Sequence, residues 1–468
     1  MYTPEDKQRD FFDDQVYDRR VPKTHELMKI KAAVAPVVVF RMLFLEYYAN
    51  LSDGEVCSQC GINLLYQAFC GIGMDDEICE PTTLVEFRNR LGEKVFKGLF
   101  DELVRQLKMQ GLLSEQVAAI DGTHMEADVL ITGMMNLLRQ GRKKALNRVG
   151  KKDKMFAEKL KEQYPSEQLM VHGKASKKQI QEEIDRTKAF ISALKSCGKG
   201  YGIEELLEEL KKLISGESKL LSFNDMDARW GYKRKDKPFA GYKAHASMDD
   251  SGIVTSVEVV SGETNESVGL EGLIKEDKSK GIESECVAAD GLYDNADTYK
   301  LSESMRIPIY TPCRHGPAEK EKEYFFFDED GCLRCRNYAR AYQDLKDGER
   351  KRYQFYAHDC QQCLSKGSCL KKSEIQRSIW FNKCCEISMK QDQIKRKEAL
   401  EKRKRIEAKF GEAKKWHFLR RARYRSRWKV GIQVFMTFFV MNAKRMVKLI
   451  RQTAAPPGSL RRVCLRSV

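Results

Sequence analysis

The sequence QVAAIDGTHMEADV at residues 116–129 contains a short apolar run that ends on a carboxylate. Residues 117–120 read as a buried strand, and Asp121 follows them directly, with a glycine behind it. The sequence ECVAADGLYDN at residues 285–295 repeats the pattern and ends its apolar run on Asp290. Because a buried carboxylate without a partner is costly, such a residue is normally paired, protonated or bound to metal. Two apolar runs that end in this way call for a joint explanation.

The segments around these two runs predict a mixed sheet with helices, an α/β (α+β) fold. Residues 239–262, FAGYKAHASMDDSGIVTSVEVVSG, predict a two-stranded hairpin with its turn at DDSG. After the second aspartate we expect a helix from about residue 295 and a strand at IPIYTP, residues 307–312. In this order the first and fourth strands can lie side by side, which would bring Asp121 and Asp290 together.

Two neighbouring carboxylates suggest a metal site. They repel each other unless cations lie between them, and Mg²⁺ is the cation that suits oxygen ligands. Two ions roughly 3.5–4 Å apart activate a nucleophile and stabilise the leaving oxygen in phosphodiester chemistry. The net charge of +16 favours a polyanionic partner such as nucleic acid. We therefore expect an enzyme that cuts or joins nucleic acid; the alternative is that each aspartate is only a turn residue before glycine.

The composition argues against membrane association and secretion. The longest apolar stretches fall short of the ~20 residues that a membrane-spanning helix needs. The N-terminal sequence MYTPEDKQRDFFDD is acidic and lacks the apolar core of a signal peptide. Fifteen cysteines without a secretion signal favour reduced thiols. We therefore expect a cytoplasmic protein.

Changes in composition divide the chain into parts. Residues 1–112 predict an all-α N-terminal domain, with a capping box at Ser52 and Glu55. Residues 138–221 are rich in Lys and Glu at helical spacing and predict a charged helical insert. The other expected parts are the core strands at 113–137 and 222–322, a Cys-rich insert at 323–387, basic C-terminal helices that complete the core at 388–452, and a tail at 453–468.

Four motifs, taken in order, resemble the DDE transposases of bacterial insertion sequences. They are AAIDGTHMEADV, FAGYKAHASMDDSGIVTSVEVVSGETNES, VAADGLYDN and RKRIEAKFGEAKKWHFLRRARYR. The helical segment PTTLVEFRNRL is similar to the N-terminal domain of the same family, which recognises transposon ends. The likeness spans residues 20 to 450 in outline, and it implies a ribonuclease-H-like core with flanking helices. The third acidic residue of this family lies in the helical pattern Tyr-x2-Arg-x3-Glu-x6-Lys, which Arg403, Glu407 and Lys414 match, whereas Leu400 takes the place of the tyrosine.

The resemblance implies a mechanism and its partners. Asp121, Asp290 and Glu407 would ligate two Mg²⁺ (or Mn²⁺) ions. One ion would activate water to hydrolyse a phosphodiester at the transposon end, and the freed 3′-hydroxyl would attack target DNA. The implied partners are the terminal inverted repeats and target DNA, bound by a homodimer in the nucleoid of a bacterial cytoplasm. The alternative is a catalytically inactive or domesticated relative that only binds DNA, as a repressor or a structural DNA-binding protein.

Basic side chains predict the DNA contacts. In the family motif, Arg403 and Lys414 would reach phosphates or the flanking base. The sequence FLRRARYRSRWK at residues 418–429 interleaves aromatic rings with guanidinium groups, which suits phosphate contact and stacking. The predicted DNA-binding residues are Arg403, Lys414, Arg420, Arg421, Arg423 and Arg425.

Helical geometry selects the third acid from three glutamates on one helix. Glu401 and Glu412 share a face, because eleven residues return to within about 20°. Glu407 projects about 120° away from Glu401. Its side of the helix carries Leu400 and Phe410, which need burial. We therefore expect Glu407 to turn toward the two aspartates; the alternative is a surface pair with the arginine one turn earlier.

A second enzyme class is excluded by one residue. The sequence AAIDGT resembles the Asp-x-Asp-Gly-Thr motif of haloacid-dehalogenase-like phosphatases, whose first aspartate is the covalent nucleophile. In this chain that position is Ala119. Without the carboxylate the covalent chemistry cannot start.

Two Cys-x2-Cys pairs in the Cys-rich insert have the spacing of a zinc ribbon. Four thiolates would close the coordination shell of Zn²⁺ and fold a small insert that lacks a core of its own. The pattern favours structural Zn²⁺ over free thiols. The predicted ligands are Cys332, Cys335, Cys360 and Cys363, with Cys369 and His358 as further candidates.

Overall fold

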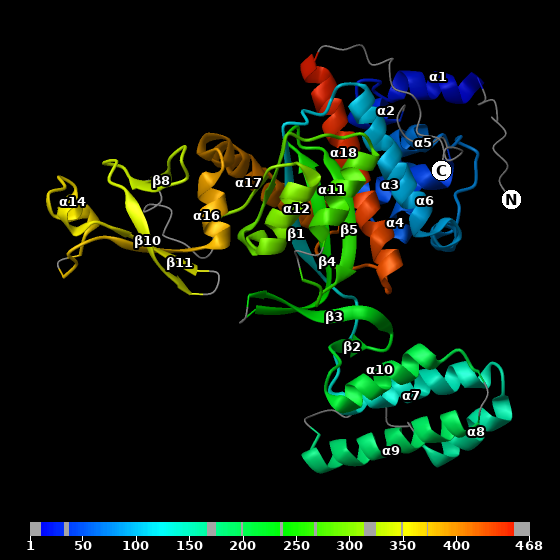
Figure 1. Cartoon of the computed structure of the whole chain (residues 1–468). Helices are drawn as coiled ribbons and strands as arrows, with labels where there is room; N and C mark the ends of the chain where they lie inside the picture. Colours follow the sequence, from blue (N-terminus) through cyan, green and yellow to red (C-terminus); the bar gives the residue numbers. More distant parts are fainter. Residues whose placement is uncertain are drawn as a thin grey trace.

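The computed structural model describes residues 11–31, 37–165, 175–197, 200–234, 237–265, 269–312, 324–347, 350–371 and 373–453. Among these residues, seven strands form a central mixed sheet (Figure 1). Its order is β2-β3-β4-β1-β6-β7, and β5 also pairs with β4. The strands are β1 (Val117–Glu126), β2 (Leu220–Ser222), β3 (Asp225–Arg234), β4 (Lys237–Asp249), β5 (Val254–Ser261), β6 (Cys286–Ala289) and β7 (Ile309–Tyr310). The predicted mixed α/β fold is confirmed, and the arrangement is consistent with a ribonuclease-H-like core.

Strand β1 joins the antiparallel and parallel halves of the sheet. It pairs antiparallel with β4 along its length and parallel with β6 through residues 117–120 only. The apolar residues of β1 end at Ile120, but the strand continues to Glu126 because its polar second half still pairs with β4. Asp121 therefore lies within β1, at the point where β6 ends beside it.

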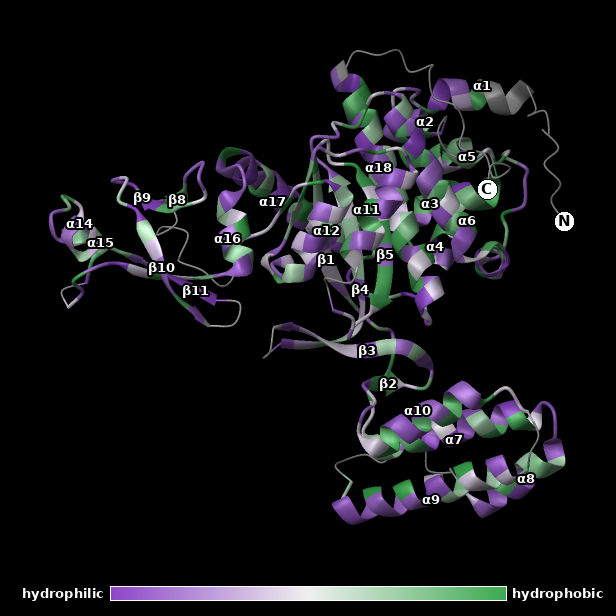
Figure 2. Cartoon of the chain, in the orientation of Figure 1, coloured by the Kyte–Doolittle hydropathy of each residue, from purple (hydrophilic) through white to green (hydrophobic). Residues whose placement is uncertain are grey.

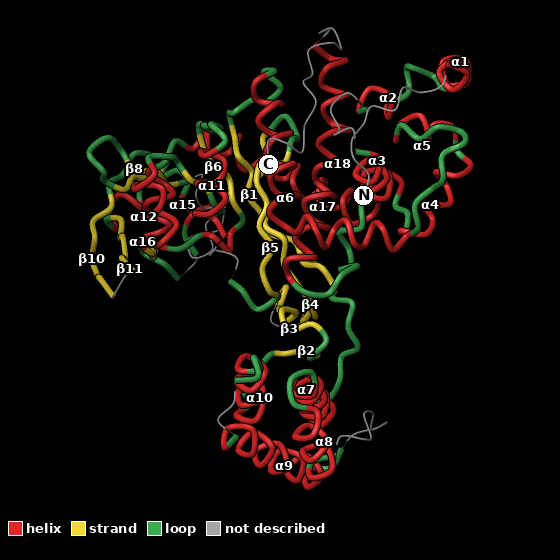
Figure 3. The backbone as a smooth tube through the Cα atoms, turned by 90° about the vertical axis from the view of Figure 1, so that its right-hand side faces the viewer, coloured by secondary structure: helices red, strands yellow, loops and turns green. Residues whose placement is uncertain are grey.

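Helices cover both faces of this sheet. Helices α11 (Gly269–Ser279) and α12 (Ala296–Met305) pack on one face, through a cluster that includes Ile120 and Ala289. Helices α17 (Gln393–Trp416) and α18 (Arg427–Thr453) pack on the other, against Ala119 and strands β4 and β5. Figure 3 shows strands β1 and β5 between these two layers. Among the described helices, none is both long and apolar enough to cross a membrane.

The N-terminal helices extend the α18 side of the core. Helices α3 and α6 pack directly on α18, and their buried side chains join one hydrophobic cluster with the sheet. Both hydrogen bonds of the predicted capping box between Ser52 and Glu55 are present at the start of α4. The helices are α1 (Phe11–Arg20), α2 (Glu26–Ile30), α3 (Val38–Ala49), α4 (Asp53–Ile62), α5 (Leu64–Cys70) and α6 (Pro81–Met109).

A cluster of buried charges connects these helices to the C-terminal part of the chain. Glu46 of α3 is fully buried and pairs with Arg88 of α6, at 3.3 Å, and with Arg423. Arg88 also binds both oxygens of Asp53, at 2.7 and 2.6 Å. Burial raises the pKa of Glu46 to about 7, although Arg423 and Arg88 oppose this shift. The two arginines therefore hold a carboxylate that would otherwise be too costly to bury in its charged form.

Two further groups of elements project from the central sheet in different directions (Figure 1). One is a helical bundle with its own apolar cluster, and Figure 2 shows polar and apolar residues mixed along each of its helices. It comprises α7 (Met134–Gly150), α8 (Lys154–Gln163), α9 (Lys177–Ser196) and α10 (Glu204–Ser215). The other is a cysteine-rich lobe, residues 324–390. It comprises β8 (Phe325–Phe327), β9 (Leu333–Cys335), β10 (Ala341–Asp347), β11 (Arg350–Phe355), α14 (Ala357–Gln361), α15 (Lys366–Cys369), β12 (Ser378–Asn382) and α16 (Lys383–Lys390).

The buried charge cluster yields a stability prediction. Replacing Glu46 by Ala leaves the Arg423 guanidinium without its carboxylate, so we expect the free energy of unfolding to fall by about 3–5 kcal/mol. Urea unfolding followed by circular dichroism measures this. The control is Glu401→Ala, which removes the exposed pair between Glu401 and Lys404 on α17 and should cost less than about 1 kcal/mol. Equal losses in the two variants would contradict the role given to Glu46.

Candidate active site

The two aspartates of the repeated sequence pattern lie beside each other in the sheet. Ile120 of β1 is opposite Ala289 of β6 in a parallel register. The next residues along the two strands are Asp121 and Asp290. The fold therefore places Asp121 and Asp290 at neighbouring strand positions at the carboxyl end of β6.

Strand alternation places both aspartates on the face that α17 covers. Val117 packs with Ala288 and with Ala399 of α17, so the odd residues of β1 and the even residues of β6 share this face. Asp121 and Asp290 continue those two rows. The intervening residues point to α11 on the opposite face.

Each aspartate also makes the local turn contact that the simpler interpretation predicted. One oxygen of Asp121 accepts a hydrogen bond from the backbone N–H of Gly122 at 2.7 Å. Asp290 accepts the same bond from Gly291 at 2.6 Å, and it caps a short 3₁₀ helix, η2 (Gly291–Tyr293). These bonds orient each carboxylate and use one of its oxygens. The second oxygen, Oδ2, of Asp121 binds a different partner.

Arg403 of α17 bridges two of the predicted acids. Its Nη1 lies 3.3 Å from Oδ2 of Asp121, and its Nη2 lies 3.1 Å from Oε1 of Glu407. The arginine and aspartate side chains are 11% and 14% exposed, whereas the glutamate is 61% exposed. The predicted surface pair between Arg403 and Glu407 thus exists, but its guanidinium also reaches into the sheet and links Glu407 to Asp121.

The other two glutamates of α17 have different partners. Glu401 pairs with Lys404 at 2.5 Å, and Glu412 lies 3.6 Å from Lys409. The helix docks through a face that includes Phe410, which is 5% exposed, as helical spacing predicted. Of the three candidates, Glu407 is the one that the structure connects to an aspartate of β1.

The three acids do not converge on a common point in this arrangement. Among the described residues, no group of three or more His, Cys, Asp or Glu side chains is placed to hold a metal ion. The chemistry of the donors nevertheless fits a divalent cation, because Asp121, Asp290 and Glu407 offer oxygen ligands only. The Arg403 guanidinium now supplies positive charge between two of these carboxylates, where a cation would otherwise stabilise them.

Part of the predicted arginine run joins the far end of β1. The backbone of Glu126 accepts a hydrogen bond from Ala422 at 2.7 Å and donates one to the carbonyl of Arg420 at 3.1 Å. Arg421 and Arg425 both contact Asp128, at 3.3 and 3.8 Å, and both remain more than half exposed. These arginines therefore lie at the surface at the end of the strand that carries Asp121.

Arg423 points the opposite way. Its guanidinium pairs with buried Glu46 and lies 4.2 Å from the centre of the Phe418 ring. This placement does not favour the DNA contact that the sequence predicted for Arg423. A residue at this position of the run has to turn inward because the adjacent backbone is hydrogen-bonded to β1 and to Gln433 of α18.

A second basic group surrounds Lys414 near the same strand end. Burial and the neighbouring Lys233 and Arg420 lower the pKa of Lys414 to about 8, although Glu126 opposes this shift. Burial, together with Lys414 and Lys233, also lowers the pKa of His124 to about 4. Sequence reasoning missed Lys233, because this residue lies on β3 and comes near Lys414 only through the pairing of the sheet.

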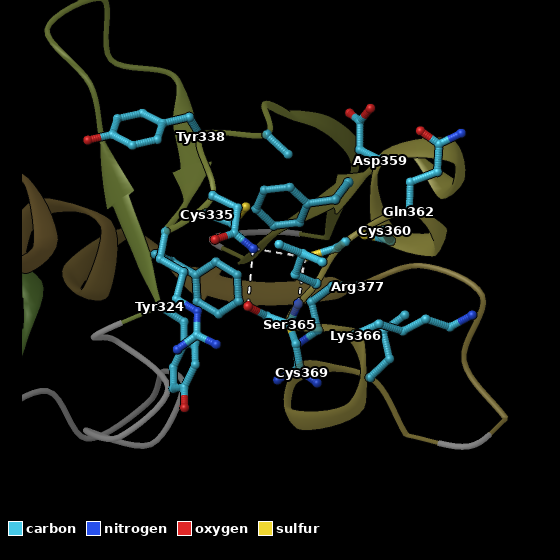
Figure 4. Close-up of a pocket in the computed structure, with 18 of the residues that line it drawn as sticks. Tyr324, Cys335, Tyr338, Asp359, Cys360, Gln362, Ser365, Lys366, Cys369 and Arg377 are labelled. Carbon is cyan, nitrogen blue, oxygen red and sulfur yellow. Dashed lines mark hydrogen bonds between the residues drawn. The ribbon is translucent and has the colours of Figure 1, made fainter.

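The structure does not bring the four predicted zinc ligands to one place; Figure 4 shows two of them, Cys335 and Cys360, at one cavity. Three of them line a cavity in the cysteine-rich lobe together with Cys369. Cys332 does not line it and lies instead near Tyr353 and Arg334. Cys335 ends β9, whereas Cys332 lies in the turn before this strand, and only Cys335 of the pair lines the cavity. The structure groups Cys335, Cys360, Cys363 and Cys369 around this cavity and places Cys332 outside it; zinc binding by the predicted four stays a prediction.

Comparison with protein families identifies the chain. A family described as Transposase DDE domain matches residues 211–443, and one described as Transposase domain (DUF772) matches residues 3–90. The first match contains Asp290 and Glu407 and begins inside α10, after Asp121. No curated protein matches the chain. The two family matches follow each other along the chain, and the DDE match contains most of the sheet described above. The chain therefore belongs to the DDE transposases of the insertion-sequence type.

Proposed function

We propose that this transposase cuts the DNA ends of an insertion sequence and joins them to target DNA by phosphodiester hydrolysis and transesterification. Membership of the family implies a DNA substrate and dependence on a divalent metal. The observation that supports this specific chemistry is the parallel register that sets Asp121 beside Asp290, with Glu407 linked to Asp121 through Arg403.

Asp121, Asp290 and Glu407 would hold Mg²⁺ (or Mn²⁺) in this proposal. Bound cations would activate the attacking hydroxyl and stabilise the leaving oxygen. The two aspartates are held by backbone N–H groups of the following glycines, so their carboxylates keep a fixed orientation. Glu407 is the more exposed acid and lies on a separate helix, so it completes the set only after Arg403 releases it.

Arg403 has two roles in the proposal. In the structure it neutralises Asp121 and Glu407, which limits repulsion among the acids. Once cations take over that function, its guanidinium becomes available to bind a DNA phosphate, for which its forked geometry is suited. DNA would then extend from the acids along β1 toward the basic groups at its far end. The residues assigned to this path are Arg403, Lys414, Lys233, Arg420, Arg421 and Arg425.

The alternative is that the protein is an inactive relative that only binds DNA. Such a protein would have the same fold and the same basic surface. The two functions differ in strand cleavage. A nicking assay on DNA that contains the element ends, with Mg²⁺ and with EDTA, separates them. We further propose that the protein acts as a homodimer on DNA, so that each of two transposon ends meets one set of acids.

The first prediction concerns the acids. Asp121→Asn, Asp290→Asn and Glu407→Gln should each slow strand cleavage by about a thousandfold or more, because each removes a charged metal ligand. DNA binding, measured by fluorescence anisotropy, should persist. The control Glu412→Gln changes a glutamate on the same helix that pairs with Lys409, and it should cleave at the rate of the unmodified protein. Full cleavage by any of the three variants would remove that residue from the site.

A second prediction concerns Arg403. Because its guanidinium competes with cations for Asp121 and Glu407, Arg403→Ala should bind Mg²⁺ several-fold more tightly in the absence of DNA. Isothermal titration calorimetry gives the affinity. Arg405→Ala is the matched control, since Arg405 lies on the same helix and binds the carbonyl of Asp250 instead. Unchanged or weaker Mg²⁺ binding in Arg403→Ala would rule out this competition.

A third prediction concerns the pKa of Lys414, which is lowered to about 8 by burial and by neighbouring cations. The ammonium is charged below this pH and neutral above it, so a phosphate contact is present at low pH and lost as the pH rises. DNA affinity should therefore fall several-fold from about pH 7 to about pH 9. In Lys414→Arg the charge persists, and the affinity should vary less with pH. The neighbouring variant Lys415→Arg should keep the original pH profile; a flat profile in the unmodified protein would refute the assignment.

A further inference from the structure

Four thiols from separate segments face one cavity of the cysteine-rich lobe. The cavity has a volume of about 810 Å³. Figure 4 shows the side chains of Cys335, Cys360 and Cys369 around it. The four lining cysteines come from the end of β9, from α14, from the loop that follows α14, and from α15; they are Cys335, Cys360, Cys363 and Cys369.

The segment that contributes three of these thiols has no apolar core of its own. Between Phe355 and Ile379, no apolar side chain of the described residues is buried, and neither α14 nor α15 buries any residue. Leu364 and Ile375 of this segment are exposed. Its described apolar contacts with the core of the lobe are made by Cys360 and Cys369. The segment therefore has little buried apolar surface to hold its conformation, and a bound metal ion would add a constraint that the apolar contacts do not supply.

Hydrogen-bond donors are already directed at these sulfurs. The backbone N–H of Ser365 and the side-chain amide of Asn337 donate to the sulfur of Cys363, at 3.4 and 2.8 Å. The backbone of Arg377 forms a hydrogen bond with Cys360. Backbone donors such as the Ser365 N–H stabilise thiolates. The cavity therefore provides the surroundings of a thiolate site as well as the sulfurs.

The thiols are also close enough to influence one another. Burial raises the pKa of Cys369, and the neighbouring Cys360, Cys363 and Cys335 raise it further, while Arg377 opposes the shift. A divalent metal that prefers sulfur would offset the repulsion among four neighbouring thiolates.

We propose that Cys335, Cys360, Cys363 and Cys369 bind one structural Zn²⁺ that fixes the segment 356–378 to the end of β9. Each thiol loses its proton to solvent as its Zn–S bond forms, and no oxidation or reduction occurs. Four thiolates are the donor set of closed, structural zinc sites. As described, the thiols do not converge on one point. The Asn337 amide, which bonds to Cys363 and Ser365 in the cavity, has to turn aside so that side-chain rotation can bring the sulfurs together.

Cys332 supplies a matched control, because sequence spacing alone would have included it. It belongs to the same Cys-x2-Cys pair as Cys335 but lies outside the cavity, beside Tyr353 and Arg334. Its backbone N–H binds Asp328 at 2.7 Å in the turn that precedes β9. The proposal therefore separates two cysteines that spacing cannot distinguish.

The test is the zinc content of the full-length chain purified with a reductant and with ZnCl₂ in the growth medium, measured by inductively coupled plasma mass spectrometry. We expect about one Zn²⁺ per chain in the unmodified protein and in Cys332→Ser. Cys360→Ser and Cys369→Ser should retain less than roughly a tenth of that amount. Cys369→His, which restores a ligand that zinc accepts, should recover zinc and show that loss in the serine variant reflects the missing donor.

A second measurement uses the unmodified protein, so it tests the zinc site even if the cysteine variants fail to fold. In the unmodified protein, a strong zinc chelator should speed trypsin cleavage within 356–378 and leave the helical bundle α7–α10 unaffected. Absence of zinc, or zinc loss in Cys332→Ser with retention in Cys369→Ser, would overturn the proposal. So would a disulfide among the four cysteines, detected as missing thiols on titration after denaturation without reductant. None of these outcomes depends on DNA cleavage, so they test the zinc site separately from the transposase mechanism.

Discussion

Strand β1 pairs in parallel with β6 so that Ile120 lies opposite Ala289, and this register fixes which side chains meet at the end of the pair. Successive residues of a strand face opposite sides of the sheet, so a shift of one residue would turn one aspartate toward α11 and leave the other facing α17. Residues 117–119 and 286–289 are buried, with alternate side chains packed toward α17 and toward α11, so such a shift would exchange the packing partners of every side chain in the strand. The apolar packing of the two strands therefore determines the separation of the two carboxylates.

The charge balance around these carboxylates depends on the docking of α17. Two acids at neighbouring strand positions repel each other, and a third on a nearby helix adds to that repulsion. Arg403 offsets it by contacting Asp121 and Glu407 at once. The ion pair between Arg403 and Asp121 favours docking of α17, and it also places the positive charge of the guanidinium next to the acids. Helix packing and the charge balance of the acids are thus coupled through one guanidinium.

Some arginines of the run after α17 are exposed at the surface, and one packs into the interior of the protein. Its backbone pairs with Glu126 at the end of β1, which anchors the run next to the strand of Asp121. Arg421 and Arg425 remain exposed, whereas Arg423 enters the buried cluster of Glu46 and connects the N-terminal helices to this segment. The DUF772 match, which covers α3, and the DDE match are therefore joined by a buried ion pair as well as by apolar packing.

The sequence by itself determined the features that depend on local periodicity: two apolar strands that lead into Asp121 and Asp290, the burial of Phe410 on the docked face of α17, and the capping box of α4. Each follows from the spacing of residues along one helix or strand, and this spacing can be obtained from the sequence alone. The tertiary structure decided the rest, because it depends on which elements become neighbours and in which direction they run. Parallel pairing of β1 with β6, the contact of Arg403 with Asp121, the inward turn of Arg423 and the grouping of Cys369 with Cys335 around one cavity all join residues far apart in sequence. Side chains on different elements meet only after packing has fixed the register, twist and face of each, and no spacing within a single segment contains that information.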